Sequence, residues 1–182
     1  MEDRNILLVY PEFLETFWGF RGLLKVIGRK AAFPPLGLLT VAAMLPKAWP
    51  KKLVDLNVRG LTPEDIAWAD CVFISAMTTQ KGSAKEVIAR CKKLGKPVVL
   101  GGPILEAGCD DFPGVSHFLL GEVENTLQEF LADLQAGTAR KIYPPRNFPS
   151  MTDSPLPLWG LADLGKYASG ICLLYTSDAA DE

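Results

Sequence analysis

The chain of 182 residues has 19 basic and 21 acidic residues, a formal net charge of −2, and a hydrophobic fraction of 48%. This balance is typical of a globular chain with one ordinary domain and some extra length, and it gives no bias toward nucleic acid. No apolar run approaches the roughly 18 residues of a membrane span. The first five residues lack the basic-then-apolar order of a signal peptide, so we expect a cytoplasmic protein.

Four cysteines occur in the chain without C-x-x-C spacing. They are Cys71, Cys91, Cys109 and Cys172. Disulfide frames and zinc sites generally show paired or closely spaced cysteines. We therefore expect reduced thiols in the core of a cytoplasmic protein.

The first third of the chain predicts two short strands separated by a long connection. Residues 5–10 are a continuous apolar run, which is typical of a strand covered on both faces, and residues 52–55 form the second strand. Pro35 suits the first turn of a helix, and the apolar residues after it predict a buried helix over 35–45. The connection over residues 11–34 is long for a compact domain, and such loops are usually functional.

The connection combines aromatic and basic residues. They are Phe13, Phe17, Trp18, Phe20, Arg21, Lys25, Arg29 and Lys30. Three interpretations stay open: a basic amphipathic helix at a membrane surface, aromatic packing over a hydrophobic ligand, and an ordinary lid or packing insert. Membrane association of a longer parent protein is therefore possible, but nothing else in the sequence supports it.

The middle of the chain alternates strands and helices. Thr62, Pro63 and Asp65 have the spacing of a helix N-cap, a first-turn proline and a capping partner. The elements predicted after them are a strand over 71–75, a helix over 83–94, strands over 98–100 and 117–120, and a helix over 122–134. Successive βα units predict an α/β fold of the flavodoxin or Rossmann-like kind. We expect a doubly wound, five-stranded parallel sheet with strand order 2-1-3-4-5.

The sequence changes character after residue 138. Five prolines lie between residues 144 and 157, so we expect residues 139–170 to be a stiff linker without regular helix or sheet. The predicted organisation is an α/β domain over 1–138, this linker, and a tail over 171–182. The tail fits neither linker nor domain and resembles translated adapter sequence, so we expect it to be non-native and the chain to be truncated.

Small residues stand where the predicted strands end. Gly101 and Gly102 follow a buried strand and precede Pro103, which predicts either close backbone approach of a ligand or simply a tight turn. Ligands of open α/β sheets bind at the carboxyl ends of the strands. The candidate binding residues from these loops are Tyr10, Pro11, Ser75, Ala76, Met77, Thr78, Gly101, Gly102, Pro103, Gly121 and Glu122. Ser75 and Thr78 could bond a ligand or cap the next helix.

The sequence lacks the residues that phosphate-binding loops and catalytic triads require. No G-x-G-x-x-G follows the first strand, and no G-x-x-x-x-G-K-[ST] occurs anywhere in the sequence. His117 is the only histidine and begins the fifth predicted strand, where we expect a structural role rather than a catalytic triad. A crevice with small residues at its floor and aromatic residues above it suits a large, mostly apolar ligand better than a nucleotide.

A strand ending in Ser75-x-Met77, a next strand ending in Gly101-Gly102 and a sheet of five βα units resemble the cobalamin-binding (B12-binding) domain. In that family the nucleotide tail of the corrinoid enters the sheet past such positions, and the corrin ring lies over the strand ends. The resemblance implies cobalamin as cofactor and partner. The alternatives are a Rossmann-like domain that binds a nucleotide and a partner-docking domain without a ligand.

One branch of the family holds cobalt with the histidine of Asp-x-His-x-x-Gly. Residues 55–60 resemble this string, with Asn57 in place of the histidine, but they follow the second strand and not the first. The resemblance therefore implies cobalt without a protein histidine ligand. Three further positions that join the candidate binding residues come from the stretch Phe33-Pro-Pro-Leu-Gly37, and they are Phe33, Pro35 and Gly37.

This stretch, with Gly121-Glu-x-Glu-x-Thr126, resembles cobalamin-dependent radical SAM enzymes, in particular the branch that includes hopanoid C-2 methylases. Such enzymes carry C-x-x-x-C-x-x-C after a linker of this kind, whereas Cys172 stands alone here. The resemblance implies the cobalamin-binding fragment of a methyltransferase, with the [4Fe–4S] cluster and S-adenosylmethionine bound only by a radical SAM domain of the full-length parent. A stand-alone corrinoid carrier is the main alternative.

Overall fold

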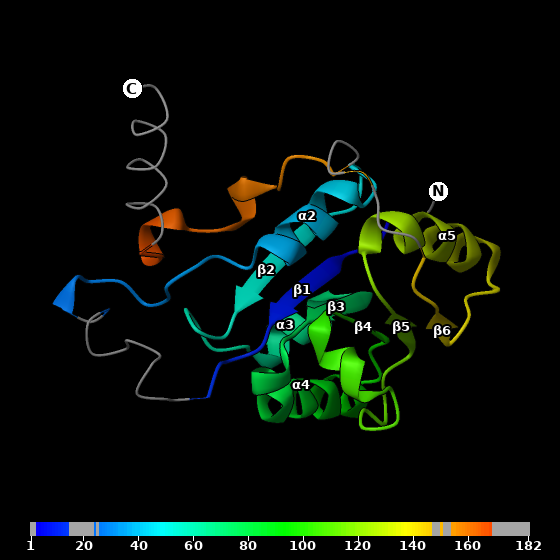
Figure 1. The fold of residues 1–182 in the computed structure, drawn as a ribbon, viewed down its shortest axis with the longest axis horizontal. Coiled ribbons are helices and arrows are strands. Elements are labelled where there is room, and N and C mark those ends of the chain that lie inside the picture. Colours follow the sequence, from blue (N-terminus) through cyan, green and yellow to red (C-terminus); the bar gives the residue numbers. More distant parts are fainter. Residues whose placement is uncertain (1–2, 15–23, 25, 147–149, 151–153, 169–182) are drawn as a thin grey trace.

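The computed structural model describes residues 3–14, 24, 26–146, 150 and 154–168. Its centre is a parallel sheet of six strands in the order β2-β1-β3-β4-β5-β6 (Figure 1). The strands are β1 (Ile6–Tyr10), β2 (Lys51–Asp55), β3 (Cys71–Ser75), β4 (Val98–Gly101), β5 (His117–Leu119) and β6 (Ile142–Tyr143). The predicted fold class and the order of the first five strands are confirmed.

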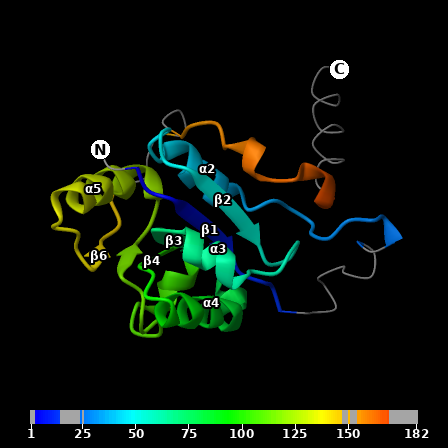
Figure 2. The same ribbon diagram turned by 180° about the vertical axis from the view of Figure 1, so that it is seen from behind.

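Two pairs of helices cover the sheet. Helices α2 (Leu36–Met44) and α5 (Val123–Ala136) lie on one face, and α3 (Pro63–Trp68) and α4 (Lys81–Lys93) lie on the other (Figures 1 and 2). Alternate residues of each strand therefore enter two separate cores. In β3, for example, Phe73 packs with the α2 and α5 side, whereas Val72 and Ile74 pack with the α3 and α4 side.

The helix ends follow the sequence signals with small shifts. Thr62 and Asp65 form the predicted capping box of α3, in which each side chain accepts a hydrogen bond from the other residue's backbone N–H. Pro35 is the N-cap of α2, so this helix begins one residue later than predicted. None of the helices in the described ranges combines the length and the apolar character that crossing a bilayer requires.

Strand β6 corrects the prediction that residues 139–170 hold no regular sheet. The backbone N–H groups of Phe118 and Leu120 donate to the carbonyl oxygens of Lys141 and Tyr143, at 2.8 and 3.0 Å. The Tyr143 ring is fully buried, and its hydroxyl donates to Asp133 at 2.9 Å. Strand β6 ends before Pro144, so no proline removes a backbone N–H donor from its pairing with β5.

The segment over residues 154–168 packs against the domain instead of extending away from it. It lies along α2 (orange in Figure 1), where the backbone N–H of Leu158 donates to Leu39 at 3.0 Å. Further on, Tyr167 pairs with Ala31 in a parallel bridge. The predicted domain boundaries stay predictions, and residues 169–182, with Cys172 and the proposed tail, lie outside the described residues.

The long connection between β1 and α2 is described only in part. The predicted aromatic and basic residues that lie outside the described residues are Phe17, Trp18, Phe20, Arg21 and Lys25. Among the described ones, Phe13 packs edge-on against Tyr10, with ring centroids 5.7 Å apart. The choice among the three interpretations of this connection therefore stays open.

Candidate functional site

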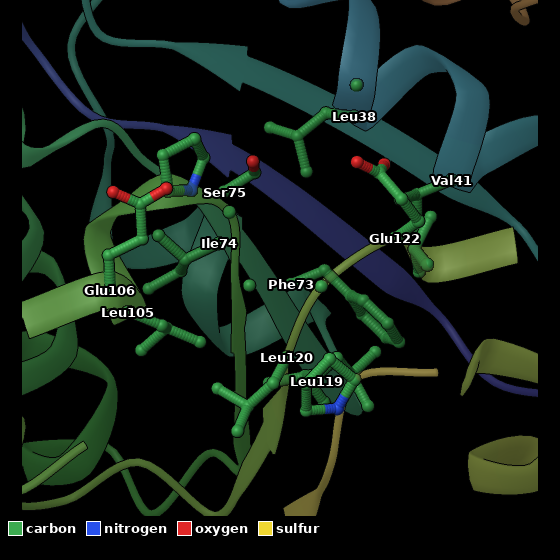
Figure 3. Close-up of a pocket in the computed structure, with 18 residues that line it drawn as sticks. Leu38, Val41, Phe73, Ile74, Ser75, Leu105, Glu106, Leu119, Leu120 and Glu122 are labelled. Atoms are coloured by element: carbon green, nitrogen blue, oxygen red, sulfur yellow. The ribbon is translucent and has the colours of Figure 1, made fainter. Parts of the chain in front are cut away.

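A cavity of about 550 Å³ lies between the sheet and the α2 and α5 layer, at the carboxyl ends of β3, β4 and β5 (Figure 3). This volume is in the range of small-molecule and cofactor sites. Seven of the predicted binding residues line it: Gly37, Ser75, Gly101, Gly102, Pro103, Gly121 and Glu122. A crevice is therefore present at the strand ends, and it lies over β3, β4 and β5.

Gly101 keeps the floor of the cavity open. It pairs in register with Ser75 of the neighbouring strand, and both residues face the α2 and α5 side. A Cβ added at Gly101 would meet Leu119 O at 3.4 Å, an ordinary contact, and φ there is not positive. The backbone thus accepts a side chain at this position, and the bulk of that side chain would enter the cavity.

Gly102 has a different role from its neighbour. Its φ is +93°, and an added Cβ would lie 2.9 Å from both Ala76 O and Ser75 Oγ. The turn after β4 therefore requires glycine for its own backbone. The tight-turn interpretation therefore applies to Gly102, whereas Gly101 leaves room above the sheet, where close approach of a ligand stays a prediction.

The segment after β6 forms one wall of the cavity. Pro145 lines it, and a Cβ added at Gly121 would lie 2.7 Å from the Pro145 Cβ. Gly121 also has a φ of +72°, so glycine allows both the turn after β5 and the close approach of the proline. Pro145 was missed because the sequence predicted a linker at this point.

Sequence reasoning also missed the apolar floor and walls of the cavity. Phe73 and Val99 stand two residues before Ser75 and Gly101 on the same face of their strands and form the floor of the cavity. Leu119 joins them from β5, and Figure 3 shows Phe73 and Leu119. The strand period of two was a usable signal, because Phe73 and Val99 each stand two residues before a predicted site residue. Leu38 and Val41 of α2 complete the lining from the helix layer.

The remaining predicted residues do not line the cavity. They are Tyr10, Pro11, Phe33, Pro35, Ala76, Met77 and Thr78. Phe33 and Met77 are 72% and 47% exposed. Ala76 is buried, and its carbonyl oxygen accepts a hydrogen bond from the backbone N–H of Ile104 at 3.0 Å. The N-cap of α4 is Gln80, so neither Ser75 nor Thr78 caps that helix.

Two side-chain amides fix the loop that follows β1. Gln80, which is buried, and Asn57 both donate to the carbonyl oxygen of Pro11, at 2.5 and 3.2 Å. The Gln80 side chain also accepts from the backbone N–H of Met77 at 2.8 Å. Asn57 accepts from the backbone N–H of Phe13 at 3.0 Å. The strand-end loops of β1, β2 and β3 are thereby joined at one point.

Asp55 is a buried carboxylate at the end of β2. It accepts hydrogen bonds from the backbone N–H and side-chain amide of Asn57, at 2.8 and 2.7 Å, and from the Tyr167 hydroxyl at 3.0 Å. Burial raises the pKa of this carboxyl, and the hydrogen bonds from Asn57 and Tyr167 offset part of the rise. The same burial, together with the Asp55 charge, raises the pKa of Tyr167.

The described residues do not form a metal site. Within those ranges, no three His, Cys, Asp or Glu side chains gather where they could hold a metal ion. His117 begins β5, and its Nδ1 lies 2.6 Å from the carbonyl oxygen of Arg140. Because β5 runs from His117 toward the cavity, the histidine lies at the far end of its strand, where a structural role fits.

The B12 binding domain model matches residues 24–131 of this chain. An uncharacterized methyltransferase of Synechocystis sp. strain PCC 6803 is 40% identical over 165 residues, which cover 90% of this chain and 31% of that protein. The hopanoid C-2 methylase of Rhodopseudomonas palustris is 34% identical over 173 residues, which cover 92% of this chain and 33% of that protein. The bacteriochlorophyllide d C-12(1)-methyltransferase of Chlorobaculum tepidum is 26% identical over 129 residues, which cover 70% of this chain and 28% of that protein.

The chain thus spans about a third of the length of these curated relatives. No solved structure gives a significant match. The resemblance to cobalamin-binding domains, and to the hopanoid C-2 methylase branch in particular, is confirmed. Since the family model matches more than half of the sequence and its fold and strand-end cavity agree with that match, this chain belongs to the B12-binding domain family.

Proposed function

We propose that this chain binds cobalamin as part of a longer methyltransferase of the radical SAM kind. The observation that carries the proposal is the cavity of about 550 Å³ above Gly101, between the sheet and α2 and α5. The nucleotide tail of the corrinoid occupies this cavity, and the corrin ring lies over the strand ends. The match to the B12 binding domain and the methyltransferase names of the relatives support this choice.

The residues around the opening fit such a ligand. Phe33, Leu36 and Met77 are exposed apolar side chains on the loops and the helix start at this end of the sheet, and they offer a surface for a large, flat ring. Glu106 and Glu122 stand on opposite sides of the cavity (Figure 3), where their carboxylates can accept hydrogen bonds from amide or hydroxyl groups.

The chain's contribution is to bind and orient the cofactor. When bound, methylcobalamin supplies a methyl group that can be transferred. The apolar lining excludes water from the tail, and the amide contacts of Gln80 and Asn57 hold the loops beside the ring in place. We further propose that this chain gives cobalt no imidazole ligand, since its single histidine lies at the opposite end of β5.

The rest of the proposed parent follows from the length of the relatives. A radical SAM domain in the same polypeptide would hold the [4Fe–4S] cluster and S-adenosylmethionine, and the transfer of the methyl group to a carbon atom would take place there. A stand-alone corrinoid carrier would need no such domain, and the methyltransferase relatives, about three times as long as this chain, argue against it.

The test is retention of cobalamin by the purified chain. The protein is mixed with hydroxocobalamin, desalted, and examined by visible absorbance, which we expect to show bound corrinoid. In Gly101→Val the valine side chain enters the cavity, so retention should fall at least about tenfold while the far-UV circular dichroism stays unchanged. Gly82→Val is the matched control, because Gly82 is exposed on α4 and an added Cβ meets nothing within 4 Å.

The outcomes separate the alternatives. A colourless wild-type protein would overturn cobalamin binding and favour the nucleotide-binding or partner-docking alternative. A wild-type protein that retains the corrinoid, with equal retention by Gly101→Val, would place the ligand outside the cavity. Loss of retention in Gly101→Val but not in Gly82→Val supports the proposed site.

A further inference from the structure

The chemistry of the cavity floor bears on which corrinoid the chain accepts, an inference that rests on the proposed function. Corrinoids of the cobamide class differ in the base at the end of the nucleotide tail. That base is a dimethylated benzimidazole in cobalamin, adenine in the adeninyl cobamides, and a phenol in the phenolyl cobamides. The part of the cavity that receives the base therefore determines which members of the class bind well.

The floor is the face of a sheet and offers no polar side chain. Phe73, Val99 and Leu119 form it, and each is at most 4% exposed. The strands β3, β4 and β5 pair with each other in register here, so their backbone N–H and C=O groups point along the sheet toward neighbouring strands and not up into the cavity. A base lying on this floor finds apolar surface without donors or acceptors.

The walls of the cavity are also mostly apolar. Leu38 and Val41 of α2 face the cavity from the helix layer (Figure 3). Val123 of α5 also lines the cavity. Of the described residues that line the cavity, three have polar side chains, and they are Ser75, Glu106 and Glu122. Ser75 ends β3, whereas the two glutamates are exposed residues of the turns after β4 and β5. Polar contacts are thus available at the mouth and not on the floor.

We infer that the cavity selects cobamides whose lower base is apolar and discriminates against a purine. Adenine joined through one ring nitrogen retains three other ring nitrogens and an amino group, which lose their water without replacement on an apolar floor. Dimethylbenzimidazole has one free ring nitrogen and two methyl groups, and a phenol has no nitrogen. Burying unpaired polar groups is costly, so the adeninyl form should bind at least about tenfold more weakly than cobalamin.

The experiment compares four corrinoids with the purified full chain. Dissociation constants are measured by equilibrium dialysis for cobalamin, an adeninyl cobamide, a phenolyl cobamide, and cobinamide, which lacks the nucleotide. The expected order is cobalamin and the phenolyl form tightest, with the adeninyl form at least about tenfold weaker. The phenolyl form shows whether polarity or size decides, because a phenol is smaller than either bicyclic base but apolar.

A pair of variants tests the floor itself. Val99→Thr keeps the shape of the side chain but adds a hydroxyl beneath the base, so the ratio between the adeninyl and the cobalamin dissociation constants should fall severalfold. Val98→Thr is the matched control, since Val98 is equally buried in the same strand but faces the α3 and α4 core. In Val98→Thr the ratio of the adeninyl to the cobalamin dissociation constant should equal that of the wild type, even though this variant loses about as much stability as Val99→Thr.

Each outcome has a distinct meaning. Equal affinity for cobalamin and the adeninyl cobamide would overturn the inference and leave cobalamin binding intact. Cobinamide binding as tightly as cobalamin would show that the tail contributes nothing, and would overturn the inference as well. Binding of none of the four would refute the proposed function and this inference with it, whereas the expected order together with the Val99→Thr change supports both.

Discussion

Two adjacent glycines at the end of β4 differ in what their backbones tolerate. Gly102 has φ +93° and ψ 177°, a region that only glycine adopts readily, and an added Cβ would lie 2.9 Å from Ala76 O. Gly101 has neither constraint. The Gly-Gly pattern alone could not separate these roles, because the difference lies in what the neighbouring strand places beside each glycine.

We expect Gly102→Ala to lower the free energy of unfolding by about 2 kcal/mol or more, from backbone strain and the close contact together. Gly101→Ala should change it by less than about 1 kcal/mol, because its Cβ meets only an ordinary contact. Urea denaturation of both variants measures the difference. Equal losses in the two variants would contradict the separate roles assigned to these glycines.

Asp55 gives the stability of this protein a definite dependence on pH. Burial raises the pKa of its carboxyl, so the folded state keeps a proton that the unfolded state releases above its ordinary pKa of about 3.9. The Asp55 contribution to the free energy of unfolding therefore falls as the pH rises from that value through the raised folded-state pKa.

The measurement is the free energy of unfolding of the wild type minus that of Asp55→Asn, taken across this range of pH. Contributions from other titrating groups largely cancel in the difference, which we expect to decrease as the pH rises and to level off above the folded-state pKa. A difference that increases with pH would mean that the hydrogen bonds from Asn57 and Tyr167 outweigh burial.

At the scale of single elements, the local signals in the sequence were strong. Continuous apolar runs gave β1 and β3, and the Thr62, Pro63 and Asp65 spacing gave the start of α3. Helix α3 has six residues, too few to be stable alone, so its cap should carry a large share of its stability.

Thr62→Ala removes the side-chain oxygen that accepts from the Asp65 backbone N–H at 3.2 Å. We expect a loss of about 1 kcal/mol in the free energy of unfolding. Thr62→Ser keeps the oxygen and serves as the control, with most of the stability retained. Chemical denaturation of the two variants provides the comparison, and a loss as large for serine as for alanine would assign the effect to the methyl group instead of the cap.

Elements that depend on distant partners were not predictable from local patterns. Strand β6 has only two residues and lies in a proline-rich stretch. What holds it in the sheet is the buried ring of Tyr143, which packs on Phe130 with ring centroids 5.4 Å apart. Ser75, Gly101 and Gly102 were predicted to line the cavity at the strand ends, whereas Phe73 and Val99 beneath them were not predicted. The wall of the cavity at Pro145 follows strand β6, so it could not be predicted without predicting that strand.

At the scale of the whole molecule, the segment over residues 154–168 is tied to the start of the chain. The hydroxyl of Tyr167 donates to Asp55, 112 positions earlier, and Lys30 N–H donates to Lys166 O at 2.8 Å. The sequence predicted a stiff linker here because five prolines lie between residues 144 and 157. The contacts that hold the segment come instead from distant residues, namely Asp55 of β2, Leu39 of α2 and residues 30–31.

We expect Tyr167→Phe to weaken this attachment, because Asp55 loses one of its hydrogen bonds in a buried position. Limited proteolysis followed by mass spectrometry should show faster cleavage within residues 154–168, with the α/β core equally resistant. Lys166→Gln is a suitable control, since the Lys166 contacts to Lys30 and Ala31 use its backbone carbonyl. Unchanged cleavage in Tyr167→Phe would mean that backbone pairing alone secures the segment.

The apolar cavity has a consequence for how the molecule responds to heat. It interrupts the packing between the sheet and two helices, so a molecule that fills it becomes part of the interior and must leave before the layers can separate. Occupancy is then coupled to folding by mass action, and a ligand at a hundred times its dissociation constant adds about 2.7 kcal/mol. The melting temperature of this domain should therefore rise with the concentration of the ligand that fills the cavity.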